Sequence, residues 1–317
     1  METPRTTTRL TWLDQCRGYA ILAMVFVNLT NEFDASPWWL RHHRDILSYN
    51  DTIAPLFMFL VGLGFNMSFA KHAGRDGLAA ARKAAVRRYA LLTLIGAIIY
   101  MGYFWDAFTD IGLAGLLALP IIHRSGRVRA GMAVGCLAAY QAIASWTPYG
   151  ARLMDECING GPVGVLNWCA MLLFGTLAWD WLREGRFVRN SLGWGVAFTV
   201  AGMALRMPWG AFKAAWPYSQ YGMSLSYTVL SIGLCFLTVL LFERACGAGK
   251  LSLPVLPVFG KNPFAIYLFH WALILPLELF VPGDVGKPVV LGIAAGVCAG
   301  CYLFARVLDW RGIVVKL

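Results

Sequence analysis

The sequence has few charged side chains for its length. Only 14% of its 317 residues are Asp, Glu, Lys or Arg, whereas 58% are hydrophobic, and the mean hydropathy is +0.59. A soluble domain needs a more polar surface, because charged residues make up about a quarter of an average soluble protein. This scarcity of charge excludes a soluble globular protein and indicates an integral membrane protein.

Signals typical of several other protein classes are also missing. We find no phosphate-binding glycine fingerprint, no low-complexity linker and no internal repeat. The short polar N-terminus leads into an apolar run without a small-residue cleavage site, so we expect that run to remain as a transmembrane helix. The eight cysteines do not suggest a disulfide framework, and Cys298 and Cys301 lack the histidine or carboxylate neighbours of a zinc site. We expect no metal.

Long apolar segments alternate with short polar ones along the whole chain. We therefore predict an all-α, polytopic helical bundle with about ten transmembrane helices, forming a single domain over residues 1–317. The candidate spans are about 13–31, 51–70, 88–104, 110–122, 130–147, 162–181, 192–206, 223–242, 262–280 and 288–305. In the last of these, Gly292, Gly296 and Gly300 repeat every four residues, which predicts close helix packing.

Basic residues outnumber acidic residues by 27 to 17, which gives a formal net charge of +10. In a membrane protein the distribution of Lys and Arg reports topology before it reports a partner, so no nucleic acid is expected. Placing the N-terminus inside leaves only six basic residues outside: Arg41, Arg44, Arg152, Arg206, Lys213 and Lys287. Both termini are predicted to be cytoplasmic, and the expected location is a bacterial inner (plasma) membrane.

The first apolar segment carries a polar stripe. Arg17 and Asn28 are eleven residues apart, which places them on one face of a helix about 16 Å apart along its axis. Asp14 lies three residues before Arg17, within reach for an ion pair. Either these groups cap the helix end and bond a neighbouring helix, or they line a site that crosses much of the membrane.

A polar loop after this segment contains the only adjacent histidines in the chain, His42 and His43. Asn28 precedes the loop, and Asp51 opens the next apolar run. A histidine that a carboxylate orients can act as a general base. The alternative is an exposed, solvated histidine pair, and the sequence leaves both open.

Two further polar groups admit a structural and a functional interpretation. Six basic residues surround an alanine-rich stretch predicted as an amphipathic surface helix: Lys71, Arg75, Arg82, Lys83, Arg87 and Arg88. In the structural interpretation, they follow the positive-inside rule and contact anionic lipid. In the functional interpretation, some of them hold the phosphates of coenzyme A. An outer aromatic segment with Trp209, Trp216 and Tyr221 forms an interfacial belt or a platform for a sugar.

Taken together, the sequence resembles the heparan-α-glucosaminide N-acetyltransferase family of transmembrane acyltransferases. The similar residues occur in order along nearly the whole chain: Arg9, Leu13, Asp14, Arg17, Gly18, Met24 to Asn28, Asp51, Pro55, Phe57, Phe59, Gly62, Ser226, Tyr227, Gly233, Gly260, Asn262, Tyr267 and His270. Each block is short, so the resemblance depends on their combination.

The resemblance implies that an acetyl group passes from cytoplasmic acetyl-CoA to an amino sugar on the far side of the membrane. It implies catalytic roles for Asn28, for Asp51 and for one of His42 and His43. We predict that acetyl-CoA is held by Asp14, Arg17, Arg87, Arg88, Lys261, Asn262, Tyr267 and His270. The segments 112–115 and 161–164 depart from the family pattern, so the acceptor is expected only to be an amine or hydroxyl of a sugar or glycan.

Several alternatives remain open at this point. The acetyl group passes directly to the acceptor or first to a histidine. Two other functions are alternatives: an O-acyltransferase of envelope polysaccharide, and a transporter of a glycolipid or small metabolite. A transporter would be expected to show internal repeats, and we find none. The expected partners are acetyl-CoA, the glycan acceptor and the lipid bilayer, and we also consider a homodimer.

Overall fold

A computed structural model describes residues 10–100, 104–206, 217–247 and 250–315 of the chain. In these ranges all regular structure is helical, and no strand occurs. The helices are α1 (Thr11–Asn31), η1 (Trp38–Leu40, a 3₁₀ turn), α2 (Asn50–Asp76), α3 (Leu78–Ile99), α4 (Ala107–Ala118), α5 (Gly126–Trp146), α6 (Tyr149–Asp155), α7 (Gly161–Arg183), α8 (Phe187–Arg206), α9 (Leu225–Cys246), α10 (Val255–Lys261), α11 (Pro263–Phe280) and α12 (Lys287–Trp310). Arg9, Trp209, Lys213 and Trp216 lie outside the described residues.

Each predicted span overlaps a helix in the described residues, which confirms the all-α class. Five helices are long and apolar enough to cross a bilayer, namely α2, α7, α9, α11 and α12, and α4 is a shorter apolar helix. The count of ten spans and the cytoplasmic placement of both termini stay predictions.

The chain divides into two compact units. Unit 1 comprises Met1–Ser36 with Thr238–Lys316, and unit 2 comprises Pro37–Leu237, so the division falls within α9. The prediction of a single domain over residues 1–317 stays a prediction.

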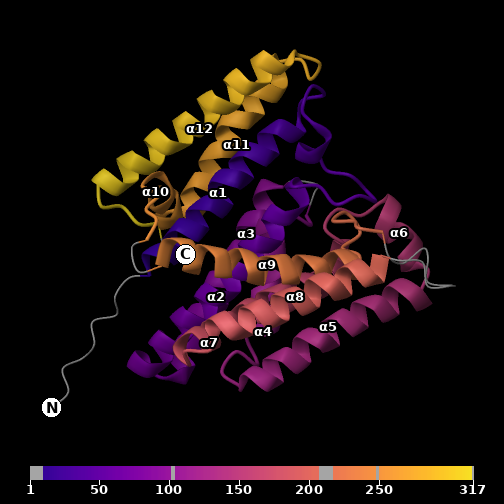
Figure 1. Ribbon diagram of the computed structural model, residues 1–317, viewed down its shortest axis with the longest axis vertical. Coiled ribbons are helices and arrows are strands. Elements are labelled where there is room, and N and C mark those ends of the chain that lie inside the picture. The colour runs from indigo at the N-terminus through magenta and orange to yellow at the C-terminus, as the bar shows by residue number, and fades with distance from the viewer. Residues whose placement is uncertain (1–9, 101–103, 207–216, 248–249, 316–317) are drawn as a thin grey trace. The chain divides into compact units, whose positions relative to one another are not determined.

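In unit 2, α7 is the central helix and packs against α2, α4, α5 and α8 (Figure 1). It is apolar on all sides, and every residue from Asn167 to Ala178 is buried. Such a helix belongs in the interior of a bundle. It meets α2 backbone to backbone, because a Cβ added at Gly62 would lie 1.9 Å from the carbonyl oxygen of Leu172.

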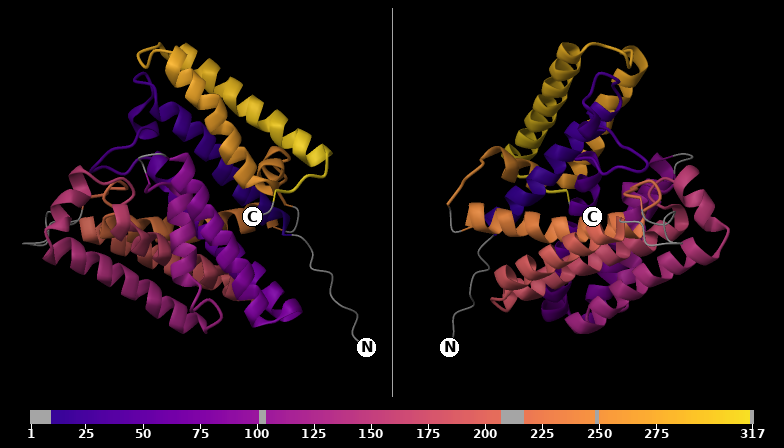
Figure 2. Two further views of the ribbon diagram at one scale, coloured as in Figure 1. Left: turned by 180° about the vertical axis from the view of Figure 1, so that it is seen from behind. Right: turned by 45° about the vertical axis from the view of Figure 1, so that its right-hand side comes forward.

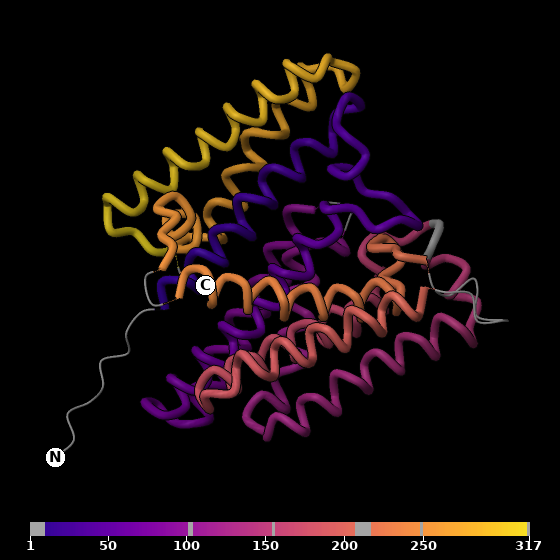
Figure 3. Tube along the Cα trace, viewed as in Figure 1, coloured from indigo at the N-terminus to yellow at the C-terminus, as the bar shows by residue number. Residues whose placement is uncertain are grey.

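The basic segment between the second and third predicted spans forms no separate surface helix. The chain reverses at Gly77, which has a φ of 86°, and the basic residues belong to the last turns of α2 and the first half of α3 (Figure 3). Alanine and arginine favour a continuous helix, so only the glycine interrupts it. The alanine-rich stretch predicted as an amphipathic surface helix is helical, as the first half of α3, with Ala81 and Ala85 buried and most of its other residues exposed.

A buried polar network joins α2, α5 and α7 in unit 2. Arg129, whose side chain is 4% exposed, pairs with the carboxylate of Asp180. The Asn66 amide donates to Asp180 and to the carbonyl of Thr176, at 2.9 Å each. The network thus satisfies charges that α5 and α7 carry into the bundle.

Replacing Arg129 by Ala is expected to lower the free energy of unfolding by about 2–3 kcal/mol, because it leaves the carboxylate of Asp180 without its counter-charge. The change would be read as a lower melting temperature of the purified protein. Arg127→Ala, at an exposed position of the same helix, is the control. Equal melting temperatures for the two variants would contradict a stabilising role for the network.

In unit 1, α1, α11 and α12 lie side by side, and the short α10 packs against α1 and α12 near the start of α1 (Figure 2). Two glycines allow α1 and α10 to touch. A Cβ at Gly18 would lie 1.8 Å from the carbonyl oxygen of Leu256, and one at Gly260 would lie 2.1 Å from that of Asp14. By contrast, a Cβ at Gly292 or Gly296 of α12 meets nothing within 4 Å, so the prediction that these two glycines mark close packing is wrong.

We expect Gly18→Ala to destabilise the protein by about 3 kcal/mol or more, because backbone atoms of α10 cannot move aside as a flexible side chain can. Gly292→Ala is the matched control: it adds the same methyl group to a helix where there is space. Thermal unfolding in detergent measures both. A Gly18→Ala protein as stable as the Gly292→Ala protein would contradict the close contact of α1 and α10.

Candidate active site

The centre of the candidate site in unit 2 is a hydrogen-bonded pair of His42 and Asp51. His42 lies in the loop after η1, and Asp51 is the second residue of α2. Nδ1 of His42 is 2.6 Å from Oδ1 of Asp51, and the two side chains are 21% and 2% exposed. A carboxylate at Nδ1 favours the neutral tautomer that donates from Nδ1 and carries its lone pair on Nε2. This arrangement suits a general base held by an orienting carboxylate.

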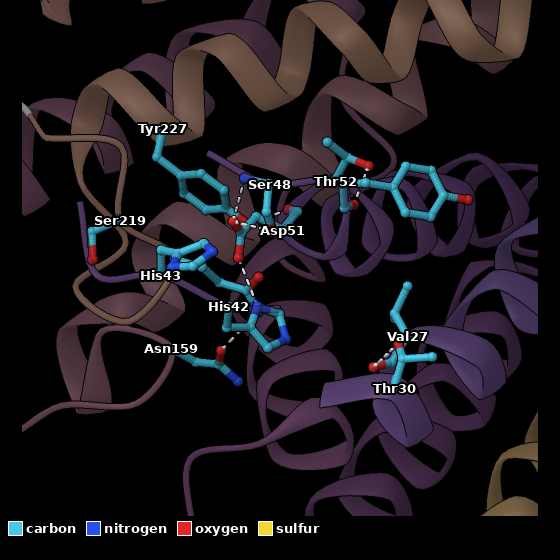
Figure 4. Close-up of polar contacts among 12 residues, drawn as sticks. Val27, Thr30, His42, His43, Ser48, Asp51, Thr52, Asn159, Ser219 and Tyr227 are labelled. Atoms are coloured by element: carbon cyan, nitrogen blue, oxygen red, sulfur yellow. Dashed lines mark hydrogen bonds and ion pairs between the residues drawn. The ribbon is translucent and has the colours of Figure 1, made fainter. Parts of the chain in front are cut away.

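The Asp51 carboxylate is itself fixed in place. Its Oδ2 accepts from the backbone N–H of Ser48 at 2.7 Å and from the Ser48 hydroxyl at 2.9 Å. The hydroxyl of the buried Tyr227, on α9, donates to the Asp51 carbonyl at 2.8 Å. Figure 4 shows these side chains converging on Asp51. Asp51 is thereby held in one orientation toward His42.

The neighbouring histidine has a different environment. Nε2 of His43 is 2.8 Å from the backbone carbonyl of Trp38, and its ring lies beside the Trp38 ring with centroids 6.2 Å apart. His43 therefore stabilises the fold of its own loop. The two adjacent histidines, which the sequence treats as equivalent, have separate partners.

Four segments of unit 2 that are distant in the sequence come together near His42. The Tyr221 ring, from the segment before α9, contacts the His42 ring edge-on at a centroid distance of 6.2 Å. Asp106, before α4, lies close enough to His42 for their charges to interact. One turn into α4, Asp110 accepts from the amide of Asn159, before α7, at 3.0 Å. Their location on the outer side of the membrane stays a prediction.

Burial raises the pKa of Asp106 from 3.8 to about 6, although the Ala107 N–H that it accepts and the nearby His42 both act to lower the pKa. A raised carboxyl pKa means that the folded protein binds this proton more tightly than the unfolded chain does. The free energy of unfolding therefore falls as the pH rises from about 4 to about 6, and above that range the loss is constant.

Asp106→Asn removes this titration and keeps a good N-cap for α4. We expect the variant to equal the wild type in stability near pH 4 and to exceed it at pH 7.5 by about 2–3 kcal/mol. Melting temperatures at the two pH values measure the difference. If the gap between variant and wild type is the same at both, Asp106 does not have a raised pKa.

In unit 1 the structure pairs Asn28 with His270. The amide nitrogen of Asn28, near the end of α1, is 3.1 Å from Nε2 of His270 on α11. Nδ1 of His270 bonds the carbonyl of Tyr267, and the Tyr267 and His270 rings lie 4.8 Å apart. Two residues predicted from separate spans, one as catalytic and one as donor-binding, thus form a single pair. This pair belongs to unit 1, and the His42–Asp51 pair belongs to unit 2.

Other predicted donor-binding residues gather where α1 begins and α10 ends. Arg17 lies 3.6 Å from Asp14, and Lys261 pairs with Asp309 of α12. Asn262 donates to the carbonyl of Ile313 and accepts from the N–H of Val315, both at 2.9 Å, so it holds the segment after α12. Phosphate groups could bind this basic end only by sharing the two cations with their carboxylates.

Arg87 and Arg88, the remaining predicted donor-binding residues, lie on α3 of unit 2. Arg87 is exposed, and the Arg88 guanidinium lies 5.7 Å from the centroid of the Tyr89 ring. Among the described residues, no group of three or more His, Cys, Asp or Glu side chains is arranged to hold a metal ion.

Two protein-family models match the chain. The model for heparan-α-glucosaminide N-acetyltransferase, catalytic, matches residues 9–202, and a model described as an acyltransferase domain matches residues 111–306. The chain belongs to the heparan-α-glucosaminide N-acetyltransferase-like family of transmembrane acyltransferases. A search of curated proteins found no match.

Membership of this acyltransferase family confirms the resemblance seen in the sequence. The first match includes Asn28, His42 and Asp51, and the second includes Tyr227 and His270. The His42–Asp51 pair of unit 2 and the Asn28–His270 pair of unit 1 therefore each lie in segments that acyltransferase models recognise. The transporter alternative loses its support, because both models describe group-transfer enzymes.

Proposed function

We propose that this acyltransferase moves an acetyl group from acetyl-CoA on the cytoplasmic side to an amine or hydroxyl of a sugar or glycan acceptor at the opposite face. The observation that carries the proposal is the 2.6 Å contact between His42 and the buried carboxylate of Asp51, in a loop predicted to lie outside. A base at that face is needed to activate an acceptor there.

In the proposed reaction, Nε2 of His42 takes a proton from the acceptor as its nitrogen or oxygen attacks the thioester carbonyl. The carbon–sulfur bond breaks, and the departing coenzyme A thiolate takes up the proton from the His42 imidazolium. Asp51 stabilises the charged ring between these two steps. Following the family resemblance, we assign the Asn28 amide to the oxygen of the thioester, where a negative charge develops.

Acetyl-CoA is treated as a co-substrate. The chain offers Arg17, Arg87, Arg88 and Lys261 for its phosphates, and their donor sets fit phosphate oxygens. Asp14 would orient Arg17, while Asn262 and Tyr267 would shape the end of α10 and the start of α11. These roles are part of the proposal. We also propose that the protein lies in a bacterial inner membrane and forms a homodimer.

A second candidate is O-acyl transfer to envelope polysaccharide, which the match to a general acyltransferase domain supports. The same base would then remove a proton from a hydroxyl. Passage of the acetyl group through a histidine is the alternative to direct transfer. Rapid-quench labelling without acceptor distinguishes these two routes, because only passage through a histidine leaves an acetylated protein.

The test uses purified protein with acetyl-CoA and two acceptors, glucosamine and glucose. Transfer to the amine of glucosamine supports an N-acetyltransferase, and transfer to both sugars supports an O-acyltransferase. Acetyl-CoA at 100 times its dissociation constant should also stabilise the protein by about 2.7 kcal/mol. Absence of both stabilisation and transfer with every acyl-CoA tested would contradict the proposal.

A further inference from the structure

The bond between His270 and Asn28 suggests a task for this histidine other than contact with the donor. We propose that His270 is a positioning residue that fixes the orientation of the Asn28 amide. This inference rests on the proposed function only in assuming that Asn28 meets the reacting carbonyl. The inference identifies His270 as the group that orients the Asn28 amide for contact with the reacting carbonyl.

The His270 ring is held in one tautomer. Its Nδ1 faces the carbonyl of Tyr267, three residues earlier in α11, and a carbonyl can only accept a hydrogen bond. Nδ1 therefore carries the hydrogen, and Nε2 carries the lone pair. The rings of Tyr267 and Trp271 pack beside it, with centroids 4.8 and 5.2 Å away. The tautomer and the plane of the ring are thus both determined within α11.

A ring nitrogen that only accepts selects one of the two orientations of the Asn28 amide. Nε2 of His270 lies 3.1 Å from the amide nitrogen of Asn28, so the NH₂ group turns toward the ring. One N–H donates to Nε2, and the direction of the second N–H of the same nitrogen is then fixed. Without the histidine the amide could rotate and present its oxygen, which would repel a developing negative charge.

Direct contact between His270 and the donor is less compatible with these contacts. The ring is fully buried at 0% exposure, and both of its nitrogens already have partners. Asn28 is only half-buried, so its amide is the part of the pair that a substrate can reach. His270 therefore acts through Asn28.

A double-mutant cycle tests this assignment. We expect Asn28→Ala to lower kcat by about 10²–10³-fold, as for loss of an oxyanion donor, and His270→Ala to lower it by about 10–100-fold. The KM for acetyl-CoA should stay within about threefold in His270→Ala. The double variant should be no slower than Asn28→Ala alone, because the two residues act as one unit. His270→Gln, which keeps an acceptor, should recover part of the loss.

His72→Ala is the control, because His72 also bonds a carbonyl of its own helix, at Ser68, and no donor contact is assigned to it. It should keep the wild-type kcat. Losses that multiply in the double variant, or a raised KM with unchanged kcat in His270→Ala, would overturn the positioning role.

A second measurement is independent of enzyme activity. The chain has five histidines, so ¹⁵N-labelled imidazole resonances can be assigned by single substitutions. We expect His270 to be protonated at Nδ1 and its Nε2 resonance alone to shift in Asn28→Ala. An Nε2 resonance that does not respond would refute the inference, whereas failure of acetyl transfer in the wild type would refute only the proposed function.

Discussion

His42→Ala is expected to lower kcat for acetyl transfer by at least about 100-fold, whereas His43→Ala should stay within about threefold of the wild type. The difference follows from their partners, since only His42 bonds a buried carboxylate, while His43 bonds the Trp38 carbonyl. Removal of the base leaves the acceptor to lose its proton to water. Steady-state rates at saturating acetyl-CoA measure the effect.

The His43 variant serves as the matched control, because it removes an imidazole from the adjacent position of the same loop. Melting temperatures of both variants should be compared, so that a loss of folded protein is not mistaken for a loss of chemistry. Equal losses in the two variants, or a greater loss in His43→Ala, would show that His42 is not the base.

Asp51→Asn should lower kcat by about 10²–10⁴-fold near neutral pH, even though it changes only one oxygen to a nitrogen. Both Ser48 donors point at Oδ2 of Asp51, so the amide oxygen of Asn must occupy that place. Its NH₂ group then faces Nδ1 of His42 and donates to it. The ring is forced into the tautomer with hydrogen on Nε2, which cannot accept a proton from the acceptor.

The matched control is Asp45→Asn, an equivalent change at an exposed position of the same loop. It should leave kcat unchanged. A tautomer change at His42 should also be visible by ¹⁵N NMR in Asp51→Asn and absent from Asp45→Asn. A fully active Asp51→Asn enzyme would contradict an orienting role for this carboxylate.

Local patterns predicted much of this molecule. Apolar runs predicted where the helices lie, because a helix that is buried in a bundle or a bilayer needs a long apolar segment that is continuous in the sequence. The spacing of Ser48 and Asp51 is a known helix-capping pattern and could have identified the hydroxyl that holds the carboxylate. The candidate catalytic residues were likewise visible as polar groups next to apolar helices.

Partners from distant segments could not be predicted. Asn28 and His270 are 242 residues apart, and Tyr227 lies 176 residues from Asp51. Nothing in either local sequence specifies such a contact, because it depends on how helices pack. The same limit explains the wrong interpretation of Gly292 and Gly296, whose spacing suits close packing although no described neighbour approaches them.

The most direct test of the central claim is acetyl transfer across a sealed membrane. Protein is reconstituted in one orientation in vesicles, with labelled acetyl-CoA only on the cytoplasmic side and an amino sugar only on the other. We predict acetylated sugar on the acceptor side with the wild type and a loss of at least about 100-fold with His42→Ala. Product on the donor side only, or equal transfer by His42→Ala, would contradict the claim that His42 activates an acceptor at the outer face.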